Sequence, residues 1–550
     1  MYIIGVSAYY HDSSACLFKD DELIFACEEE KFTGIKHDNS FPYKAIEHIF
    51  TAYGLTKSDI ECVCYYEKPI LRLKRRKSFL KSLGNNILVW RNLRKISNKI
   101  HYTPHHISHM TYSYLTSNFI NATLVSIDGV GETATVSFGK GENGKVTQLK
   151  TIEYPNSLGL FYSAMTAFLG FKPNEGEYKV MGLASYGDPS IFRDKLKLLI
   201  HYGASVLDCN LDAFCWDKSN DMMFNEKLEE LLGIEARMVG DPITQLHKDL
   251  AASVQERYES IFFQLISSAK LFYDTNNLCL GGGCAYNGSA NGKVVPKGLY
   301  DRLWIPPAPS DAGSSVGTCL DYLSRIKGRY VKLNPSPFLG PSYNRSVIQD
   351  AITKTPNIIA RKYKLPKLLT LVASLLSSGL VVGWYQDRIE FGARALGNRS
   401  ILANPTISSM KDTINKVIKK REGFRPFAPM VCFEDQGKYF ESDEYVPYMN
   451  QVVKVKEEYR DILVAVTHID GTARIQSVAK NAPCYDLLKE FEKITGYPIL
   501  LNTSFNVKDK TMVLTPQDAM DTFLSTDMDV LVMGDYIIYK QKSHENNRVD

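Results

Sequence analysis

The sequence predicts an α/β protein made of two units, and three features support this. Residues 2–8 alternate like a strand, 11–14 are a polar turn, and 15–18 resume the strand pattern. The stretch 331–343 contains three prolines and suits an extended connection. Beyond it, helix and strand patterns alternate again. The boundary therefore lies near residue 335, with one α/β unit on each side.

The second half contains the clearer periodic segments. We predict helices at 366–378 and 516–525 and strands at 380–385, 498–502 and 529–533. Residues 368–385 carry no charge and approach the length of a transmembrane helix, but Gly379 interrupts them. A helix ending at this glycine and a buried strand explain the run better, so we expect no membrane span.

The composition is that of a folded protein without a polyanion partner. The 550 residues are 44% hydrophobic and 23% charged, which excludes intrinsic disorder. Ten basic residues and no acidic one lie within 71–100 and more than account for the net charge of +4. This segment is either a solvated helical face or an anion-recruiting patch, and we expect no nucleic-acid partner. Eleven cysteines without a Cys-x-x-Cys pair, and a first segment unlike a signal peptide, predict a cytoplasmic protein.

Two histidines and two aspartates form a candidate metal site. His105 and His109 share one face of a predicted helix, whereas His106 points elsewhere. Asp128 ends an apolar strand, and Asp311 precedes a helix of small residues. This donor set suits Fe²⁺, Mn²⁺ or Zn²⁺ better than Ca²⁺. The alternative is that the histidines only pack or cap.

A glycine-rich turn and a cationic cluster are candidate anion sites. Gly281, Gly282 and Gly283 follow a strand and precede a predicted helix near Asn287, where backbone amides could approach a phosphate. A turn required only for tight packing explains them equally well. Guanidinium groups among glycines and prolines favour phosphate binding, although Glu390 and Glu422 could pair with them at the surface. The cluster consists of Arg394, Arg399, Lys420, Arg421, Arg425 and Arg474, followed by Asn502, Ser504 and Asn506.

Several long motifs, in order along nearly the whole chain, resemble the O-carbamoyltransferase family of nodulation and antibiotic-biosynthesis enzymes. Departures at Ser185 and Ala393, where proline is expected, leave the candidate ligands intact. The motifs are Ser-Ala-Tyr-Tyr-His-Asp-Ser-Ser at 7–14, Glu-Glu-Glu-Lys-Phe-Thr at 28–33, the His105/His109 pair, Glu-Gly-Glu-Tyr-Lys-Val-Met-Gly-Leu-Ala-Ser-Tyr-Gly at 175–187, and Glu-Phe-Gly-Ala-Arg-Ala-Leu-Gly-Asn-Arg-Ser at 390–400.

The resemblance implies a fold and a two-step reaction. It implies an actin-like domain (a duplicated ribonuclease-H-like fold) at 1–335, a linker and the start of the second domain at 336–365, and a YrdC-like α/β domain at 366–545. The second domain would convert carbamoyl phosphate and ATP, used with Mg²⁺, to carbamoyl-adenylate. The first would transfer the carbamoyl group to a hydroxyl of a small-molecule or sugar acceptor. One bound divalent metal, expected to be Fe²⁺, would assist the transfer.

The resemblance also implies residue roles. His105, His109, Asp128 and Asp311 would hold the metal, and Asp12 or His11 would accept the proton of the acceptor hydroxyl, unless both only shape the hairpin. Lys179, Gly281, Gly282, Gly283 and Asn287 would contact the nucleotide, although Lys179 could instead extend from a helix to solvent. The cationic cluster and its polar companions would stabilise charge during adenylation.

Three alternatives remain open at this stage. The first is threonylcarbamoyl transfer to tRNA, which requires a broad basic surface. The second is an actin-like small-molecule kinase, which would release ADP instead of pyrophosphate. The third is a metal-dependent ATP-binding scaffold without turnover. The acceptor, the metal identity and a homodimeric state are not fixed by the sequence.

Overall fold

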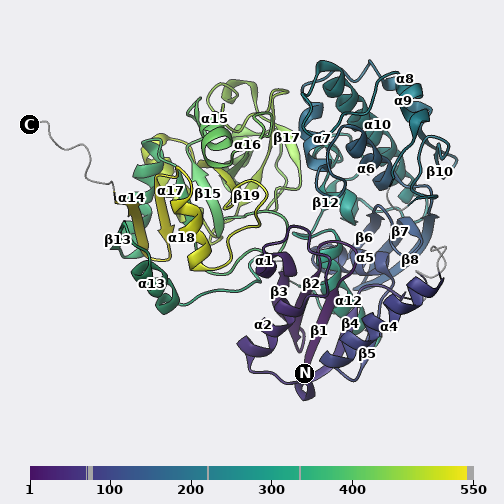
Figure 1. Cartoon of the computed structure of the whole chain (residues 1–550), viewed down its shortest axis with the longest axis horizontal. Helices are drawn as coiled ribbons and strands as arrows, with labels where there is room; N and C mark the ends of the chain where they lie inside the picture. Colours follow the sequence, from purple (N-terminus) through teal and green to yellow (C-terminus); the bar gives the residue numbers. More distant parts are fainter. Residues whose placement is uncertain (70, 72–78, 220–221, 334–335, 542–550) are drawn as a thin grey trace, which may run out of the picture. The chain divides into compact units, whose positions relative to one another are not determined.

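A computed structural model describes residues 1–69, 71, 79–219, 222–333 and 336–541 of the chain (Figure 1). Arg72, Lys74, Arg75, Arg76 and Lys77 of the basic segment lie outside the described residues, and of Lys81 only the backbone is described. The chain divides into two compact units. The first holds Met1–Thr33, His37–Ser336 and Asn450–Val452, and the second holds Gly34–Lys36, Pro337–Met449 and the chain from Val453 onward.

The first unit contains two five-stranded sheets of the same topology. The first has the order β3 (Glu22–Glu28), β2 (Ser14–Lys19), β1 (Tyr2–Ser7), β4 (Ile60–Tyr65) and β5 (Ile100–Tyr102). The second has the order β8 (Lys145–Glu153), β7 (Ala134–Glu142), β6 (Asn121–Ile127), β11 (Asn277–Gly281) and β12 (Arg302–Trp304).

Strand directions repeat as well as strand order. In each sheet the first three strands along the chain are antiparallel, and the last two run parallel to the first. This repeat is the duplication that the predicted ribonuclease-H-like fold requires, so the first unit has the expected internal symmetry of strand connection.

Two helices pack closely in this unit and carry candidate ligands. They are α5 (His105–Leu115) and α12 (Asp311–Arg325). A Cβ on Gly317 of α12 would lie 2.0 Å from the Ser108 carbonyl of α5, and one on Gly5 of β1 would lie 1.9 Å from the Ser315 carbonyl of α12. The small residues of α12 therefore allow the helix backbone to touch both a neighbouring helix and a sheet.

The remaining elements of this unit are peripheral to these contacts. They are α1 (Glu29–Thr33), α2 (Tyr43–Tyr53), η1 (Lys57–Asp59), α4 (Phe79–Ile96), α6 (Leu158–Phe168), α7 (Glu177–Ala184), α8 (Arg193–Lys197), β9 (Ile200–Gly203), β10 (Val206–Cys209), α9 (Glu226–Leu232), α10 (Gln245–Ala269), η2 (Gly283–Tyr286) and α11 (Gly288–Asn291).

The second unit is built on a mixed eight-stranded sheet. Its order is β13 (Ile358–Lys362), β22 (Tyr536–Lys540), β21 (Val530–Met533), β14 (Val382–Tyr385), β15 (Arg399–Ala403), β20 (Ile499–Ser504), β16 (Ala428–Cys432) and β19 (Gln476–Val478). Its helices are α13 (Arg345–Lys354), α14 (Leu365–Ser377), α15 (Met410–Asp412), η3 (Thr413–Ile418), α16 (Phe433–Tyr439), η4 (Glu457–Tyr459), α17 (Tyr485–Thr495) and α18 (Pro516–Leu524). A short pair is formed by β17 (Val452–Lys454) and β18 (Thr472–Arg474).

Alternate residues of the strands bury against different helices. Val382, Val530 and Val532 share a buried cluster with α14 and α17, whereas Leu531 and Met533 share another with α18. Because side chains alternate across a strand, helices cover both faces of this sheet.

The predicted helices and strands of the second half are confirmed within about three residues. Residues 336–365, predicted as a linker and the start of a domain, contain α13 and β13, which pairs antiparallel with β22. The uncharged run 368–385 forms most of α14 and then β14. Within the described residues, no helix combines the length and apolar character needed to cross a membrane.

Candidate functional site

The first unit brings together the four residues predicted to bind metal. His105 and His109 lie one turn apart on α5, Asp128 follows β6 directly, and Asp311 is the first residue of α12. All four are buried, with exposures of 3% or less. Their ligand atoms lie within 4.8 Å of one another. His106 points away, and its Nδ1 contacts the Ser137 hydroxyl at 2.7 Å.

The geometry of this cluster fits a bound cation. The Nε2 atoms of the two histidines are 3.0 Å apart. Asp128 Oδ2 lies 3.3 Å from His105 Nε2 and 3.1 Å from His109 Nε2. Asp311 Oδ1 lies 3.4 and 3.6 Å from the same nitrogens. Neither carboxylate oxygen of Asp311 has a hydrogen-bond partner. A buried carboxylate of this kind is costly unless a cation balances it, and two imidazoles with two carboxylates suit a divalent transition ion.

Neighbouring groups hold the ligands in place. The Ser314 hydroxyl lies 3.1 Å from Nδ1 of His109, and Glu132 accepts the backbone N–H of His105 at 3.0 Å. Burial raises the pKa of the Asp128 carboxyl, but hydrogen bonds from His105 and His109 outweigh it and hold that pKa well below its usual range. The cluster therefore favours ionised carboxylates facing imidazole nitrogens.

The glycine turn packs against this cluster. A Cβ on Gly281 would lie 3.0 Å from the Cβ of His109, and one on Gly283 would lie 3.1 Å from Asp128 Oδ1. Gly282 has φ +87°, and its amide donates to the Pro309 carbonyl at 2.8 Å. The packing explanation for these glycines is therefore satisfied. Contact with a nucleotide stays a prediction.

The two other residues predicted to contact the nucleotide have protein partners. Both oxygen and nitrogen of the Asn287 amide bond to Gln255, and its oxygen also caps α11 through the Ala290 amide. This side chain fixes the turn. Lys179 lies on α7, with its ammonium 5.6 Å from the ring centre of Phe171.

His11 and Asp12 lie beside the metal cluster, in the turn between β1 and β2. His11 Nε2 is 3.9 Å from Asp311 Oδ2, and His11 Nδ1 is 3.0 Å from Asp12 Oδ2. The other oxygen of Asp12 lies 2.7 Å from Nδ1 of His37. Burial lowers the pKa of His11, but the charges of Asp311 and Asp12 raise it to about 10. His37 was not predicted from the sequence because it is distant from the hairpin along the chain.

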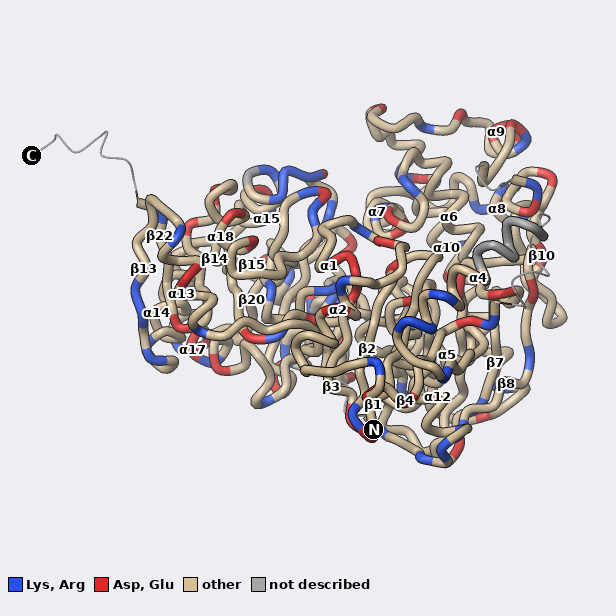
Figure 2. The backbone as a smooth tube through the Cα atoms, turned by 60° about the horizontal axis from the view of Figure 1, so that its bottom comes forward, with Lys and Arg blue, Asp and Glu red and all other residues tan. Residues whose placement is uncertain are grey.

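The second unit contains a cationic cluster whose buried member was not predicted. Lys419 follows η3, is 2% exposed, and donates to the backbone carbonyl of Ser504 and, at 2.6 Å, to Asn506 Oδ1. Burial and the charges of Arg421 and Arg425 lower the pKa of Lys419 well below its usual range. The predicted residue, Lys420, is exposed and has φ +50°. In Figure 2 this segment is the blue stretch of the tube next to α15.

Arg474 and its neighbours extend this cluster. Arg474 ends β18, and its Nε has no hydrogen-bond partner. Burial and the charges of Arg394, Arg421 and Arg425 lower its pKa well below the usual value. Glu422 lies 3.6 Å from Arg425, whereas the Glu390 carboxylate accepts the amides of Leu396 and Asn398. Positive charge therefore exceeds negative charge among these residues, as a phosphate site requires.

Two further predicted residues have different surroundings. Arg399 is completely buried, stacks 3.7 Å from the ring centre of Tyr385, and donates to the carbonyls of Gln386, Asp387 and Asn398. Backbone carbonyls bind both of its terminal nitrogens, whereas its buried Nε has no hydrogen-bond partner, and its role in stabilising substrate charge stays a prediction. Asn502 donates to Ala395 and Gln476, and its buried Oδ1 has no partner.

Comparison with known proteins identifies related sequences over the whole chain. Residues 2–86 and 75–320 match the family described as "Carbamoyltransferase N-terminus", and residues 373–540 match "Carbamoyltransferase C-terminus". The nodulation protein NolNO of Sinorhizobium fredii is 37% identical over 97% of this chain and 80% of its own length. The nodulation protein NolO of Bradyrhizobium diazoefficiens is 37% identical over 80% of this chain and 79% of its own. An uncharacterized protein of Synechocystis sp. is 36% identical over 98% of this chain and 97% of its own length.

Proposed function

The chain belongs to the carbamoyltransferase family and is a carbamoyltransferase enzyme, and from this premise we propose that it works in two ATP-dependent steps. The second unit would form carbamoyl-adenylate from carbamoyl phosphate and ATP, used with Mg²⁺. The first unit would transfer the carbamoyl group to a hydroxyl of a small-molecule or sugar acceptor. The observation that carries this proposal is the pair of clusters, one of cations around the buried Lys419 and one of buried carboxylates and imidazoles.

The first step is assigned to the cationic cluster. Hydrolysis of carbamoyl phosphate by water leaves carbamate and releases inorganic phosphate. An oxygen of the carbamate then attacks the α-phosphorus of ATP while the bond to pyrophosphate breaks. Negative charge builds on the phosphoryl oxygens, and Lys419, Arg421 and Arg474 would stabilise it. Arg394, Arg425 and the exposed Lys420 would add to the positive field around the nucleotide. The hydroxyl of Ser504 and the amides of Asn502 and Asn506 would bind carbamoyl or phosphate oxygens, with Asn506 also orienting Lys419.

The second step is assigned to the cluster of the first unit. The acceptor oxygen attacks the carbamoyl carbon, the bond to the adenylate oxygen breaks, and AMP leaves. Asp12 or His11 would take the hydroxyl proton; Asp12 contacts Nδ1 of His11 and orients the ring, and a cation held by Asp311 would offset the negative charge that otherwise keeps His11 protonated. A divalent ion such as Fe²⁺, held by His105, His109, Asp128 and Asp311, would supply Lewis-acid polarisation of the carbamoyl carbonyl. Gly281–Gly283 and Lys179 would border the nucleotide.

The test is to supply the intact protein with ATP and carbamoyl phosphate and to identify the products. We expect pyrophosphate release that requires carbamoyl phosphate, and carbamoyl-adenylate detectable by mass spectrometry. ADP as the sole nucleotide product would instead identify a kinase. Candidate alcohols are then screened for the mass gain of one carbamoyl group. Salt-sensitive tRNA binding, together with tRNA modification, would point to the threonylcarbamoyl alternative.

A further inference from the structure

His37 lies between α1 and α2, in a segment that is bound to the turn between β1 and β2. Tyr9 and Ser13 of this turn each donate a backbone N–H to a carbonyl of the segment, at 2.9 and 2.8 Å. These two hydrogen bonds lie on either side of His11 and Asp12 in the sequence. The fold therefore holds His37 against the turn that carries both candidate proton acceptors.

The carboxylate of Asp12 is held at both of its oxygens. Oδ2 lies 3.0 Å from His11 Nδ1, and Oδ1 lies 2.7 Å from His37 Nδ1. The torsions that orient an Asp carboxylate and a His ring are broad, so neither group fixes its own orientation. With the Oδ2 contact alone, the carboxylate and the His11 ring could turn together. The second contact, from His37, fixes the plane of the carboxylate and the direction of Oδ2.

The backbone of His37 is itself fixed by an ion pair. Its N–H donates to Glu30 Oε2 at 2.9 Å, and Glu30 Oε1 lies 2.8 Å from the ammonium of the buried Lys31. His37 has φ +52° and Asp12 has φ +50°. These left-handed conformations cost free energy in residues other than glycine and persist where the surrounding contacts impose them. Both ends of the contact between Asp12 and His37 are therefore built into the fold.

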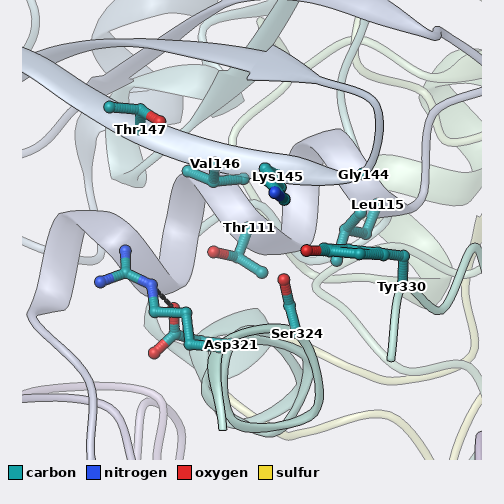
Figure 3. A pocket seen from close by; sticks show the side chains of 10 residues that line it. Thr111, Leu115, Gly144, Lys145, Val146, Thr147, Asp321, Ser324 and Tyr330 are labelled. Carbon is teal, nitrogen blue, oxygen red and sulfur yellow. Dashed lines mark ion pairs between the residues drawn. The ribbon is translucent and has the colours of Figure 1, made fainter. Parts of the chain in front are cut away.

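A second carboxylate of the same unit also contacts a histidine, at a distance from the metal ligands. Asp321 lines a pocket of about 280 Å³ (Figure 3). Its Oδ1 lies 2.6 Å from Nε of Arg325, and its Oδ2 lies 3.2 Å from Nε2 of His101. Asp321 belongs to the second half of α12, whereas the metal ligand Asp311 begins this helix. The contact between Asp321 and His101 therefore ties α12 to β5 without reaching the metal cluster.

We propose that His37 is a positioning residue for carbamoyl transfer, because it holds the Asp12 carboxylate and thereby the orientation of Asp12 and His11 beside the metal cluster. This role rests on the proposed transfer step, in which one of these two residues takes the proton of the acceptor hydroxyl. His11 Nε2 lies 3.9 Å from Asp311 Oδ2, so a rotation of its ring changes its distance from the cluster. His37 acts through Asp12 and binds neither the carbamoyl group nor the metal.

The test compares three substitutions in the full chain. His37→Gly accepts the left-handed backbone and removes the contact with Asp12. His37→Asn keeps both, because Asn tolerates this conformation and its amide nitrogen takes the place of Nδ1 as a donor. His101→Ala removes the contact with Asp321 and is the matched control. If His37→Gly does not fold, His37→Gln, whose amide nitrogen lies one bond farther from the backbone, tests the same loss.

Transfer and structure are measured separately. AMP release from chemically prepared carbamoyl-adenylate is followed with glycerol as the probe alcohol. We expect kcat to fall about tenfold in His37→Gly, while the KM for carbamoyl-adenylate and the bound metal change by less than about twofold. His37→Asn and His101→Ala should keep kcat within about twofold of the parent protein. In crystal structures, the His11 ring should turn in His37→Gly and keep its orientation in His37→Asn.

Three results would overturn the proposal. An unchanged His11 ring in His37→Gly would show that His37 does not orient it. A kcat in His37→Asn as low as in His37→Gly would mean that the imidazole is needed for more than its contact with Asp12. Loss of metal in His37→Gly would place His37 in the metal site. The crystal structures decide the role of His37 even if the parent protein transfers no carbamoyl group, an outcome that would instead refute the proposed function.

Discussion

The two units each contain a cluster of charged residues, but the clusters have opposite sign, and only that of the first unit is buried throughout. In the first unit, two imidazoles face two carboxylates, and both oxygens of Asp311 have no hydrogen-bond partner. In the second, Lys419 and Arg474 lie among further arginines, and their pKa values are lowered. Since a protein buries unbalanced charge only at a cost, the first cluster is built to hold a cation and the second to hold an anion.

Within the arginine-rich part of the second unit, the partners of each charged group distinguish residues that favour a ligand from residues that support the fold. Arg399 and Arg474 both belong to the arginine-rich part of the second unit. Backbone carbonyls and the Tyr385 ring occupy the guanidinium of Arg399, whereas Arg474 faces other positive charges. A buried charge whose partners are all in the protein supports the fold, and one whose neighbours repel it favours a ligand. Lys419 has both features, because it donates to Ser504 and Asn506 and is repelled by Arg421 and Arg425.

The largest effect is expected from the cation cluster. His109→Ala removes a buried ligand, so carbamoyl transfer should fall about 100- to 1000-fold while carbamoyl-adenylate formation changes by less than about threefold. Pyrophosphate release and carbamoylated product are measured separately on the intact protein, with metal content determined by elemental analysis. His106→Gln, on the same helix but outside the cluster, is the control.

This experiment tests the division of labour between the units. Equal loss of both activities in a folded His109→Ala protein would contradict the assignment of transfer to the first unit. Full activity after removal of all bound metal by chelation would contradict the metal site itself.

The next effect concerns the anion cluster. Lys419→Met should reduce the rate of pyrophosphate release about 100-fold, because it removes a buried ammonium from the site where negative charge develops. Lys416→Met is the matched control, since Lys416 lies three residues earlier, is exposed, and pairs with Asp412. Transfer from chemically prepared carbamoyl-adenylate should remain intact in both variants. If Lys416→Met and Lys419→Met had equal rates, Lys419 would have no role in adenylation.

Much of this comparison could be predicted from the sequence because it depends on short spacings. The i, i+4 relation of His105 and His109 fixes a shared helix face, and the apolar run before Asp128 places it at the end of a strand. The helices and strands of the second half follow from hydrophobic periodicity. These signals are local, so one sequence suffices for them.

The burial and the partners of several site residues depend on tertiary contacts, and these could not be predicted from the sequence. Lys419 and Lys420 are adjacent and chemically identical, and the backbone after η3 determines that Lys419 is buried and Lys420 exposed. The contacts of Arg399 could not be predicted, because its partners are backbone carbonyls, which carry no sequence signal. The glycine turn at 281–283 packs against α5 and against the end of β6, both of which lie far away along the chain.

Arg399 and Arg474 can be compared by measuring the free energy of unfolding and the rate of pyrophosphate release in variants of each. Arg399→Met leaves several buried carbonyls without donors and should lower the free energy of unfolding by about 2–3 kcal/mol. Arg474→Met removes a charge that its neighbours repel, so stability should stay equal or rise while pyrophosphate release slows. Chemical denaturation and the pyrophosphate assay give the two readouts. Equal destabilisation by both substitutions would remove the distinction.

One histidine from each unit allows a comparison that depends on pH in metal-free protein. Burial and the charge of His105 lower the pKa of His106 to about 3. Burial also lowers the pKa of His468 to about 4, although the charge of Asp470 opposes this shift. Both histidines are neutral in the folded protein and protonate near pH 6.5 when it unfolds. Their contribution to stability is therefore present above pH 6.5 and is lost as the pH falls toward 3 and 4, by about 1.4 kcal/mol per pH unit for His106.

An anion should distinguish these two histidines. Arg474 and Lys411 contribute to the lowered pKa of His468, so bound pyrophosphate should offset their charge and raise that pKa, while His106 keeps its value. Histidine-selective NMR titration with and without pyrophosphate measures both shifts in one sample, and Arg474→Met should reduce the response of His468. An unchanged His468, or a response of equal size at His106, would mean that the anion does not bind at the arginine cluster.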